Sequence, residues 1–388
     1  MKLMPFMIKD EVSRMGFPLK EAENRTEIIR SHMAAEGIGV LVAYSMQWKS
    51  EIVHYLSNYR MLGLSACVVL PLSSDPVLFI SEEGDMERAA STGWIRDVRL
   101  FDGYDLTEVI ALARMHGNVC AVAGLEILTA KQYAAFDIAF CDHLRNGLHI
   151  IDEAAKIKSP WEIKLLEDGG QLADIGFLAE ISAIHCGLKE YELAADMNFA
   201  MCAAGADDNF QMLAAGKDLS CMHVPREKKI ESGDLILSEI TPMKCSITYA
   251  VQLCRTAKLG KATSIEYDKY MLLVEALEKS LSAIKPGVRA GEIAKIQNQI
   301  IGAEGYEKYC KPPYMRSRGH NFGLGQFELT EDNEEELREG MAMVVHPNQY
   351  LPETGYLACG ETIIVTATGI RRLSKLPVHL YEIEEVTQ

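Results

Sequence analysis

Two histidines of this chain lie in segments that could present an imidazole to a ligand. His320 stands within Arg318-Gly-His-Asn-Phe-Gly-Leu-Gly, where flanking glycines let the backbone approach a bound molecule closely. His223 precedes Pro225 and a predicted strand that begins near Asp234. Near neutral pH an imidazole can take a proton from water or donate one to a leaving nitrogen. Both histidines are therefore candidate catalytic residues.

Two glutamates interrupt apolar strand patterns. Glu239 lies in Leu235-Ile-Leu-Ser-Glu-Ile, where strand alternation places it on the same face as Leu237. Glu361 comes immediately before Thr362-Ile-Ile-Val. A carboxylate that enters a buried strand needs a partner or a catalytic task. We therefore treat both glutamates as candidates for proton transfer, nucleophilic attack or cation binding.

Two amides, a thiol and a third histidine are further candidates. Gln252 and Asn348 each offer a hydrogen-bond donor and an acceptor, which suits orienting a substrate carbonyl or amide. Cys254, two residues after Gln252 on the same strand face, is a conceivable nucleophile, although buried cysteines usually pack as inert side chains. His346 ends a strand before Pro347, and the sequence leaves open whether it points into a pocket.

Three arginines are candidates for binding a substrate carboxylate. Arg60, Arg316 and Arg318 could each make a bidentate contact of the kind that a guanidinium forms with a carboxylate. The alternative for each is a surface ion pair of little energetic weight.

The elements that must position these residues fall into two domains. Residues 1–154 alternate helix and strand patterns and predict an α/β domain. Residues 155–388 carry long helices and intervening strands, which predicts an α+β domain with helices outside a curved antiparallel sheet. Ser159-Pro-Trp-Glu has the capping signals of a helix start. The predicted elements of this second domain are helices at 159–184, 190–204, 265–284 and 290–301, and strands at 235–239, 248–256, 342–346 and 362–366.

Composition limits the classes of partner. The chain has 388 residues and a net charge of −16, which argues against nucleic acid and anionic membrane surfaces as partners. Its ten cysteines are scattered without a CxxC pair, as in a reducing compartment. The first residues are too short and too soon charged for a signal peptide, and no apolar run reaches transmembrane length. We therefore expect a cytoplasmic protein that acts on a small molecule.

The second domain resembles the pita-bread family, which includes methionine aminopeptidases, prolidases and creatinase. Residues 1–154 match the creatinase-type N-terminal domain more weakly, including His54-Tyr-Leu-Ser-Asn-Tyr-Arg. Five separated segments of the second domain occur in the family's order: Lys158-Ser-Pro-Trp-Glu, Met222-His-Val-Pro before Gly233-Asp, Leu253-Cys-Arg-Thr, Gly319-His and Gly360-Glu.

The resemblance implies a metal site that has been altered. In metal-dependent members, Asp, Asp, His, Glu and Glu hold two divalent ions. The matching residues here are Glu239, Gln252, His320, Asn348 and Glu361, so two anionic ligands have become amides. Hard divalent cations prefer anionic oxygen, so we expect no dinuclear centre and no required cofactor. A single Mn, Co or Zn ion on Glu239, His320 and Glu361 remains an alternative.

One neighbouring stretch departs from the family in a second way. In metallopeptidases the region of His346 runs into a Glu-Pro-Gly segment. Here the corresponding residues are His346-Pro-Asn-Gln-Tyr.

The resemblance also suggests a function. By analogy with creatinase, the chain would be a metal-independent hydrolase of a C–N bond in a guanidino, amidine, lactam or amide compound. His223 would be the general base, Glu239 and Glu361 would bind a cationic nitrogen or supply a nucleophile, and His320 would orient the substrate with the two amides. Creatinase-like relatives are homodimers, in which an arginine of the N-terminal domain, here approximately Arg60, reaches the partner's site.

Two other functions remain open at this stage. The first is an Xaa-Pro aminopeptidase or dipeptidase that works with one metal ion. The second is a catalytically silent pita-bread protein that only binds a ligand. Metal content and turnover would discriminate the three.

Overall fold

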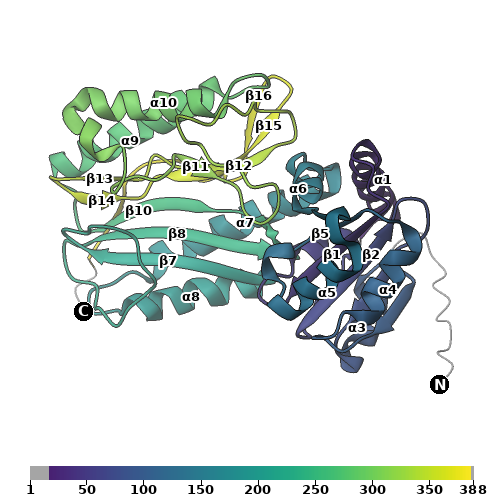
Figure 1. Cartoon of the computed structure of the whole chain (residues 1–388). Coiled ribbons are helices and arrows are strands. Elements are labelled where there is room, and N and C mark those ends of the chain that lie inside the picture. Colours follow the sequence, from purple (N-terminus) through teal and green to yellow (C-terminus); the bar gives the residue numbers. More distant parts are fainter. Residues whose placement is uncertain (1–16, 386–388) are drawn as a thin grey trace. The chain divides into compact units, whose positions relative to one another are not determined.

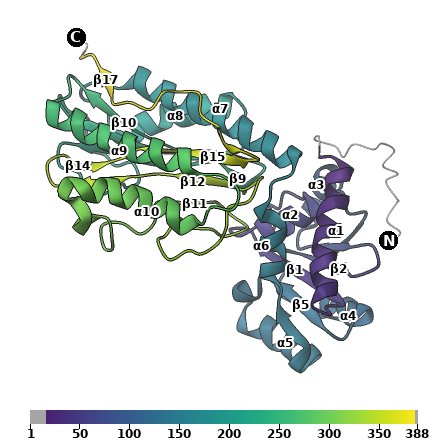
Figure 2. The same ribbon diagram turned by 90° about the horizontal axis from the view of Figure 1, so that it is seen from above.

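The computed structural model describes residues 17–385 (Figures 1 and 2). The chain divides into two compact units, the first ending at Ala155 and the second beginning at Lys156.

The first unit is built on a mixed six-stranded sheet with the order β4-β3-β2-β1-β5-β6. β1 pairs antiparallel with β2 and parallel with β5, while β2 and β3 form an antiparallel hairpin. An apolar cluster that includes Val42, Phe79 and Phe136 fills its core. The elements are β1 Val40–Met46, β2 Ser65–Pro71, β3 Val77–Ile80, β4 Asp97–Leu100, β5 Cys120–Ala123, β6 Leu144–Asn146, α1 Leu19–Ala35, α2 Glu51–Ser57, α3 Met86–Thr92, α4 Thr107–His116, α5 Ala130–Phe140 and α6 Leu148–Lys156.

The second unit is built on a nine-stranded sheet that carries the candidate residues. Its main path is β11-β12-β15-β10-β8-β7, and β9, β16 and β17 pair with β8, β15 and β10. All these pairings are antiparallel except that of β10 with β17. The strands of this sheet are β7 Asp208–Gly216, β8 Leu235–Lys244, β9 Ser246–Ala250, β10 Leu253–Leu259, β11 Gly319–His320, β12 Ala342–Val345, β15 Gly360–Thr366, β16 Gly369–Arg372 and β17 Tyr381–Ile383. A separate antiparallel pair consists of β13 Gln349–Leu351 and β14 Gly355–Leu357.

Four long helices cover this sheet in two pairs. In Figure 1, α7 (Pro160–Ala183) and α8 (Glu190–Ala203) lie on one side, and α9 (Ser264–Ala283) and α10 (Ala290–Ile301) lie on the other. Each pair has its own apolar cluster against the strands. Short turns of 3-10 or π type occur at Glu83–Asp85, Leu125–Ile127, Cys141–His143, Gly302–Tyr306 and Glu307–Tyr309.

Local signals explain where these helices begin and how closely they pack. Ser159 caps α7 with the predicted reciprocal bonds to Glu162, and Thr263 caps α9 in the same way. Gly176 lets α7 approach the sheet, because a Cβ there would lie 2.7 Å from Met201 Sδ and 3.0 Å from Ile240 Cγ2.

The junction between β10 and β15 is short. Only two residue pairs form its ladder, Leu253 with Glu361 and Cys254 with Gly360. Side chains continue the pairing on both sides of the ladder. The hydroxyl of Thr362 bonds the backbone N–H and C=O of Gln252, and the hydroxyl of Thr256 bonds those of Ala358.

The fold class predicted from the sequence is confirmed, and several elements differ from the prediction. The strand predicted at 248–256 is broken at 251–252 into β9 and β10. β7, α5 and α6 were not predicted, and Glu361 lies inside β15 where the sequence placed it before the strand. Within residues 17–385, the model has no helix with the length and apolar character needed to cross a bilayer.

Candidate functional site

One row of residues crosses the sheet of the second unit on a single face. Glu239 of β8 pairs with Cys254 of β10, and Cys254 pairs with Gly360 of β15. Paired residues in a ladder point to the same side. The predicted alternation of Glu239 with Leu237 is confirmed, because Leu237 and Cys254 belong to one apolar cluster while Ile240 belongs to the other.

Asn348 holds the Glu239 side chain. Its Nδ2 donates to Glu239 Oε1 at 2.7 Å, and its Oδ1 accepts the backbone N–H of Cys359 at 2.7 Å. Because the Cys359 N–H can only donate, the amide has one acceptable orientation. Burial raises the pKa of Glu239 to about 7, and the hydrogen bond from Asn348 opposes this rise. Glu239 is therefore a carboxyl group that can exchange a proton near neutral pH.

Glu361 lies on the opposite face, which corrects its placement in the candidate cluster. It pairs with Leu253, which in turn pairs with Ile240, so it points away from Glu239. Its oxygens form ion pairs with Arg255 Nη2 at 3.3 Å and Arg372 Nη1 at 3.1 Å. Burial raises the pKa of Glu361, and the two arginines lower it. Gly360, with no side chain, stands on the face where the sequence placed Glu361.

Arg255, on this opposite face, donates hydrogen bonds to backbone carbonyl groups. It is fully buried, and its Nη1 donates to the carbonyl oxygens of Cys254 at 3.0 Å and Gly360 at 2.8 Å. Its Nη2 also reaches the carbonyl of Leu376 at 3.3 Å. The Arg255–Glu361 pair therefore reinforces the β10–β15 junction.

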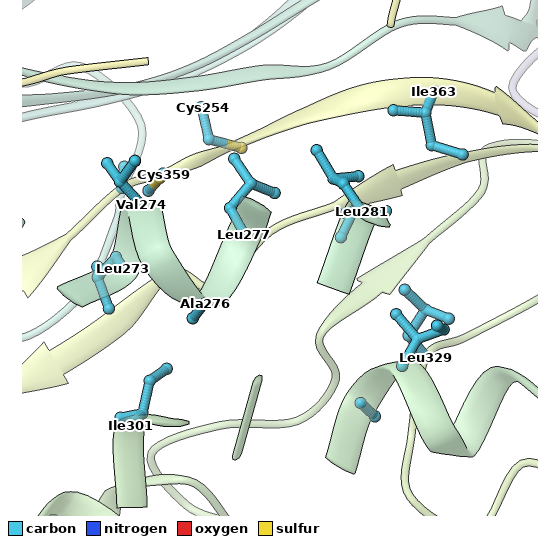
Figure 3. Close-up of a cluster of buried hydrophobic side chains, with 14 of the residues drawn as sticks. Cys254, Leu273, Val274, Ala276, Leu277, Leu281, Ile301, Leu329, Cys359 and Ile363 are labelled. Atoms are coloured by element: carbon cyan, nitrogen blue, oxygen red, sulfur yellow. The ribbon is translucent and has the colours of Figure 1, made fainter. Parts of the chain in front are cut away.

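Cys254 in the row and the neighbouring Gln252 have side chains that bond within the protein. Gln252 Nε2 donates to Thr241 Oγ1 at 3.3 Å, and Cys254 Sγ lies 3.6 Å from Gln252 Oε1. Cys254 is fully buried, and burial holds the pKa of its thiol well above the usual range. Figure 3 shows Cys254 within the apolar cluster near Leu277 and Cys359. The thiolate needed for nucleophilic attack is disfavoured there.

His320 and His346 lie side by side. Their ring centroids are 5.2 Å apart at an interplanar angle of 64°. His320 Nδ1 lies 3.1 Å from the carbonyl oxygen of Asn321, and burial lowers its pKa. Burial, followed by the neighbouring His320, lowers the pKa of His346 to about 3. Both rings are therefore neutral at physiological pH.

His346, and not Asn348, occupies the strand position next to Gly360. Val345 pairs with Glu361, so His346 follows on the face of Gly360. In the His346-Pro-Asn segment, it is thus the histidine that stands where metallopeptidases have the glutamate of Glu-Pro-Gly. The sequence contained this signal, but the resemblance alone did not fix the register.

His223 lies beside β7. Its carbonyl accepts the N–H of Leu213, and its Nδ1 lies 2.8 Å from the carbonyl oxygen of Val224 and 3.8 Å from Glu190 Oε2. Its Nε2 is buried without a hydrogen-bond partner in the described part of the chain. No hydrogen bond or ion pair given by the structure between residues 17 and 385 links His223 to Glu239 or His320. Its proposed role as a base is untested by this geometry.

The three candidate arginines have different surroundings. Arg318 is buried, with Nε donating to Asn298 Oδ1 at 2.6 Å and Nη1 to the carbonyl of Asn348 at 3.3 Å. It therefore positions the segment that carries Asn348. Arg316 is exposed and pairs with Glu328 at 2.7 Å. Arg60 belongs to the first unit, where its backbone N–H bonds Thr92.

The side chains on this face do not fit the two ions that the resemblance implies. Glu239 is the one carboxylate of the row, Gly360 offers no donor, and Gln252 supplies only an amide. Between residues 17 and 385, no three or more His, Cys, Asp or Glu side chains are grouped to hold a metal ion.

A model of the metallopeptidase family M24 matches residues 164–367. The chain belongs to this family. It is 32% identical over 232 residues to an Xaa-Pro dipeptidase of Pyrococcus horikoshii, covering 58% of this chain and 64% of that protein. It is 26% identical over 333 residues to an Xaa-Pro dipeptidase of Lactobacillus helveticus, covering 82% and 89%.

Solved structures of the family share the fold across nearly the whole chain. The prolidase of Pyrococcus horikoshii OT3 aligns with a TM-score of 0.80 at 25% identity, covering 92% of this chain and 99% of that chain. An Xaa-Pro dipeptidase from Bacillus anthracis aligns with a TM-score of 0.81 at 24% identity, covering 93% and 99%. The sequence matches to the two Pyrococcus dipeptidases span 64% and 65% of their lengths, just under two thirds.

Proposed function

We propose that this M24 protein hydrolyses a C–N bond of amide type, with Xaa-Pro dipeptides as the first substrates to test. The observation that carries the proposal is the row of Glu239, Cys254 and Gly360, with the His320–His346 pair at its end. It places a carboxyl group and two neutral imidazoles on one face of the family's sheet. The names of the similar proteins supply the substrate class.

Glu239, His320 and Arg318 have different roles in the proposed hydrolysis. Glu239, oriented by Asn348, is the group that takes a proton from water and returns it to the leaving nitrogen. His320 keeps its hydrogen on Nδ1 toward the Asn321 carbonyl, so its Nε2 offers a lone pair to the substrate. Arg318 fixes the Asn348 segment and keeps this arrangement in place.

A panel assay tests the proposal. The purified protein is dialysed against EDTA and offered Ala-Pro, Leu-Pro and Met-Pro, with and without added Mn²⁺ or Co²⁺. Release of proline supports the proposal, and a requirement for Mn²⁺ or Co²⁺ would assign it to a one-ion form of the dipeptidase reaction. Failure to release proline under every condition would refute the Xaa-Pro substrate class.

A second candidate is metal-independent hydrolysis of a guanidino acid, amidine, lactam or other small amide. The misfit of the donor set favours it, because Gly360 and Gln252 stand on the face where the family's metal-dependent members hold two ions. The same EDTA-treated protein is offered creatine, 2-pyrrolidinone derivatives and cyclic amidines. Turnover that is insensitive to EDTA would support this candidate over the first.

We also propose that the protein is a homodimer, on the strength of its resemblance to creatinase-like members. Sedimentation velocity at several protein concentrations measures this directly. A single monomeric species across the range would refute it.

A further inference from the structure

Gly360 provides space for His346. A Cβ at Gly360 would lie 2.5 Å from His346 Cβ, 2.6 Å from His346 Cα and 2.6 Å from the carbonyl oxygen of Val345. Such distances are far below ordinary van der Waals contact. Residue 360 therefore cannot carry a side chain while His346 keeps its place. We call this closely packed pair, Gly360 and His346, the 346/360 seat.

The imidazole in this seat has an unused polar atom. His346 is 9% exposed, and its Nδ1 is buried without a hydrogen-bond partner in the described residues. Its backbone N–H donates to the carbonyl of Arg318 at 3.0 Å, and its ring packs against His320. The residue is thus held firmly while Nδ1 remains unsatisfied. A buried unsatisfied polar atom is costly to a fold and calls for a specific explanation.

A small cavity lies one residue pair further along the sheet from the seat. Val344 and Thr362, one pair further along β12 and β15 on the same face, line a small cavity with Asn321 and Phe322. Thr248 also lines this cavity, and its Oγ1 is a second buried hydroxyl without a partner among the residues described. A second unsatisfied polar group, the Thr248 hydroxyl, therefore lies in the cavity that Val344 and Thr362 line.

We propose that His346, seated on Gly360, is a substrate-contacting residue whose Nδ1–H donates to the carbonyl oxygen of the amide group that the protein hydrolyses. The inference rests on the proposed function. Xaa-Pro dipeptides, lactams and other amides all have a carbonyl group at the C–N bond that is hydrolysed. It assigns to a neutral imidazole the position next to Gly360. Glu239 faces this position from the other side of the β10–β15 junction.

Kinetics of His346 variants test the contact. His346→Ala should lower kcat/KM for the best compound of the panel about tenfold or more, as expected for one lost hydrogen bond. His346→Asn should recover most of this loss, because its Nδ2 stands at the same number of bonds from the backbone as the imidazole Nδ1. His185→Ala, at an exposed histidine of the same unit, is the matched control. Equal losses in the Ala and Asn variants would show a packing role only and overturn the proposal.

A double-mutant cycle tests the seat without any substrate. Gly360→Ala should lower the Tm strongly in the wild-type background and less when combined with His346→Gly, because the contact with His346 Cβ is then gone while those with His346 Cα and the Val345 carbonyl oxygen remain. Equal losses in both backgrounds would overturn the seat. If the wild-type protein turns over no compound of the panel, the proposed function fails and with it the substrate contact, while this cycle still decides the seat.

Discussion

Glu180 predicts an unusual dependence of stability on pH. It lies on α7, is fully buried, and accepts a hydrogen bond from Ser238 Oγ at 2.6 Å through Oε1. Its Oε2 is buried without a partner in the described part of the chain. Burial raises the pKa of Glu180 to about 8, and the Ser238 hydrogen bond opposes only part of this rise. Glu180→Gln keeps the size and the acceptor and removes the ionisation.

The magnitude follows from proton linkage. An unfolded Glu has the ordinary pKa of 4.5, whereas folded Glu180 keeps its proton up to about pH 8. The folded chain thus binds one more proton between these values, so the wild type loses stability as pH rises through this window. Each pH unit is worth about 1.4 kcal/mol, which gives roughly 3 kcal/mol at pH 7 and roughly 5 kcal/mol at pH 8. Below the unfolded pKa, both states are protonated and the penalty is absent.

Guanidinium unfolding at pH 5, 6, 7 and 8 measures this penalty as the difference between Glu180→Gln and wild type. Contributions from other titrating groups cancel in the difference, which should grow in favour of the variant with pH. Glu275→Gln, at an exposed position of α9, is the matched control for loss of a carboxylate. Parallel curves for Glu180→Gln and wild type would show that folded Glu180 ionises normally and would refute the reasoning.

Three further predictions concern the sheet of the second unit. Asn348→Leu removes the donor to Glu239 and should lower kcat about tenfold, measured on the best panel substrate; an unchanged kcat would separate Asn348 from the reaction. Glu361→Gln leaves the buried Arg255 without its counter-charge, while Arg372 keeps Glu278, and should destabilise the fold by about 3 kcal/mol in urea unfolding; a neutral result would contradict the Arg255–Glu361 ion pair. Millimolar Mn²⁺ should raise the Tm by less than about 1 °C, because ligand binding to the native state would otherwise stabilise it, and a larger shift would reveal a metal site.

Features encoded within a few residues could be predicted from the sequence. The capping box of Ser159 and Glu162 needs only adjacent residues, and both ends of the helix at 290–301 match α10. The face of Glu239 followed from simple alternation within one strand. These signals are local, so tertiary contacts were not required to interpret them.

The placement of Glu361 and His346 needed the structure. In a strand, a shift of one residue moves every side chain to the other face. Matching the family's last ligand to Glu361 was such a shift, because Gly360 has no side chain to draw attention to its position. The sequence analysis matched Asn348, and not His346, to a metal ligand of the family for a related reason. Only the pairing of Val345 with Glu361 shows that His346 is the residue next to Gly360.

The ion-pair partners of Glu361 on the opposite face of the sheet could not be predicted from the sequence. Arg255 is near it only because β10 and β15 pair, and Arg372 arrives from β16. The hydrogen bond from Asn348 to Glu239 likewise joins residues 109 positions apart in the chain. Contacts of this kind follow from the pairing of strands far apart in sequence, which a single sequence does not specify.

The short junction of β10 and β15 has a mechanical consequence for the candidate site. Its ladder holds two residue pairs, and the hydroxyls of Thr256 and Thr362 and the guanidinium of Arg255 make the remaining links. Side-chain links of this kind are more compliant than a continuous backbone ladder, so bending of the sheet concentrates along this line. Glu239 lies on one side of the line and His346 on the other. Flexing of the sheet along this line would therefore change the separation between Glu239 and His346.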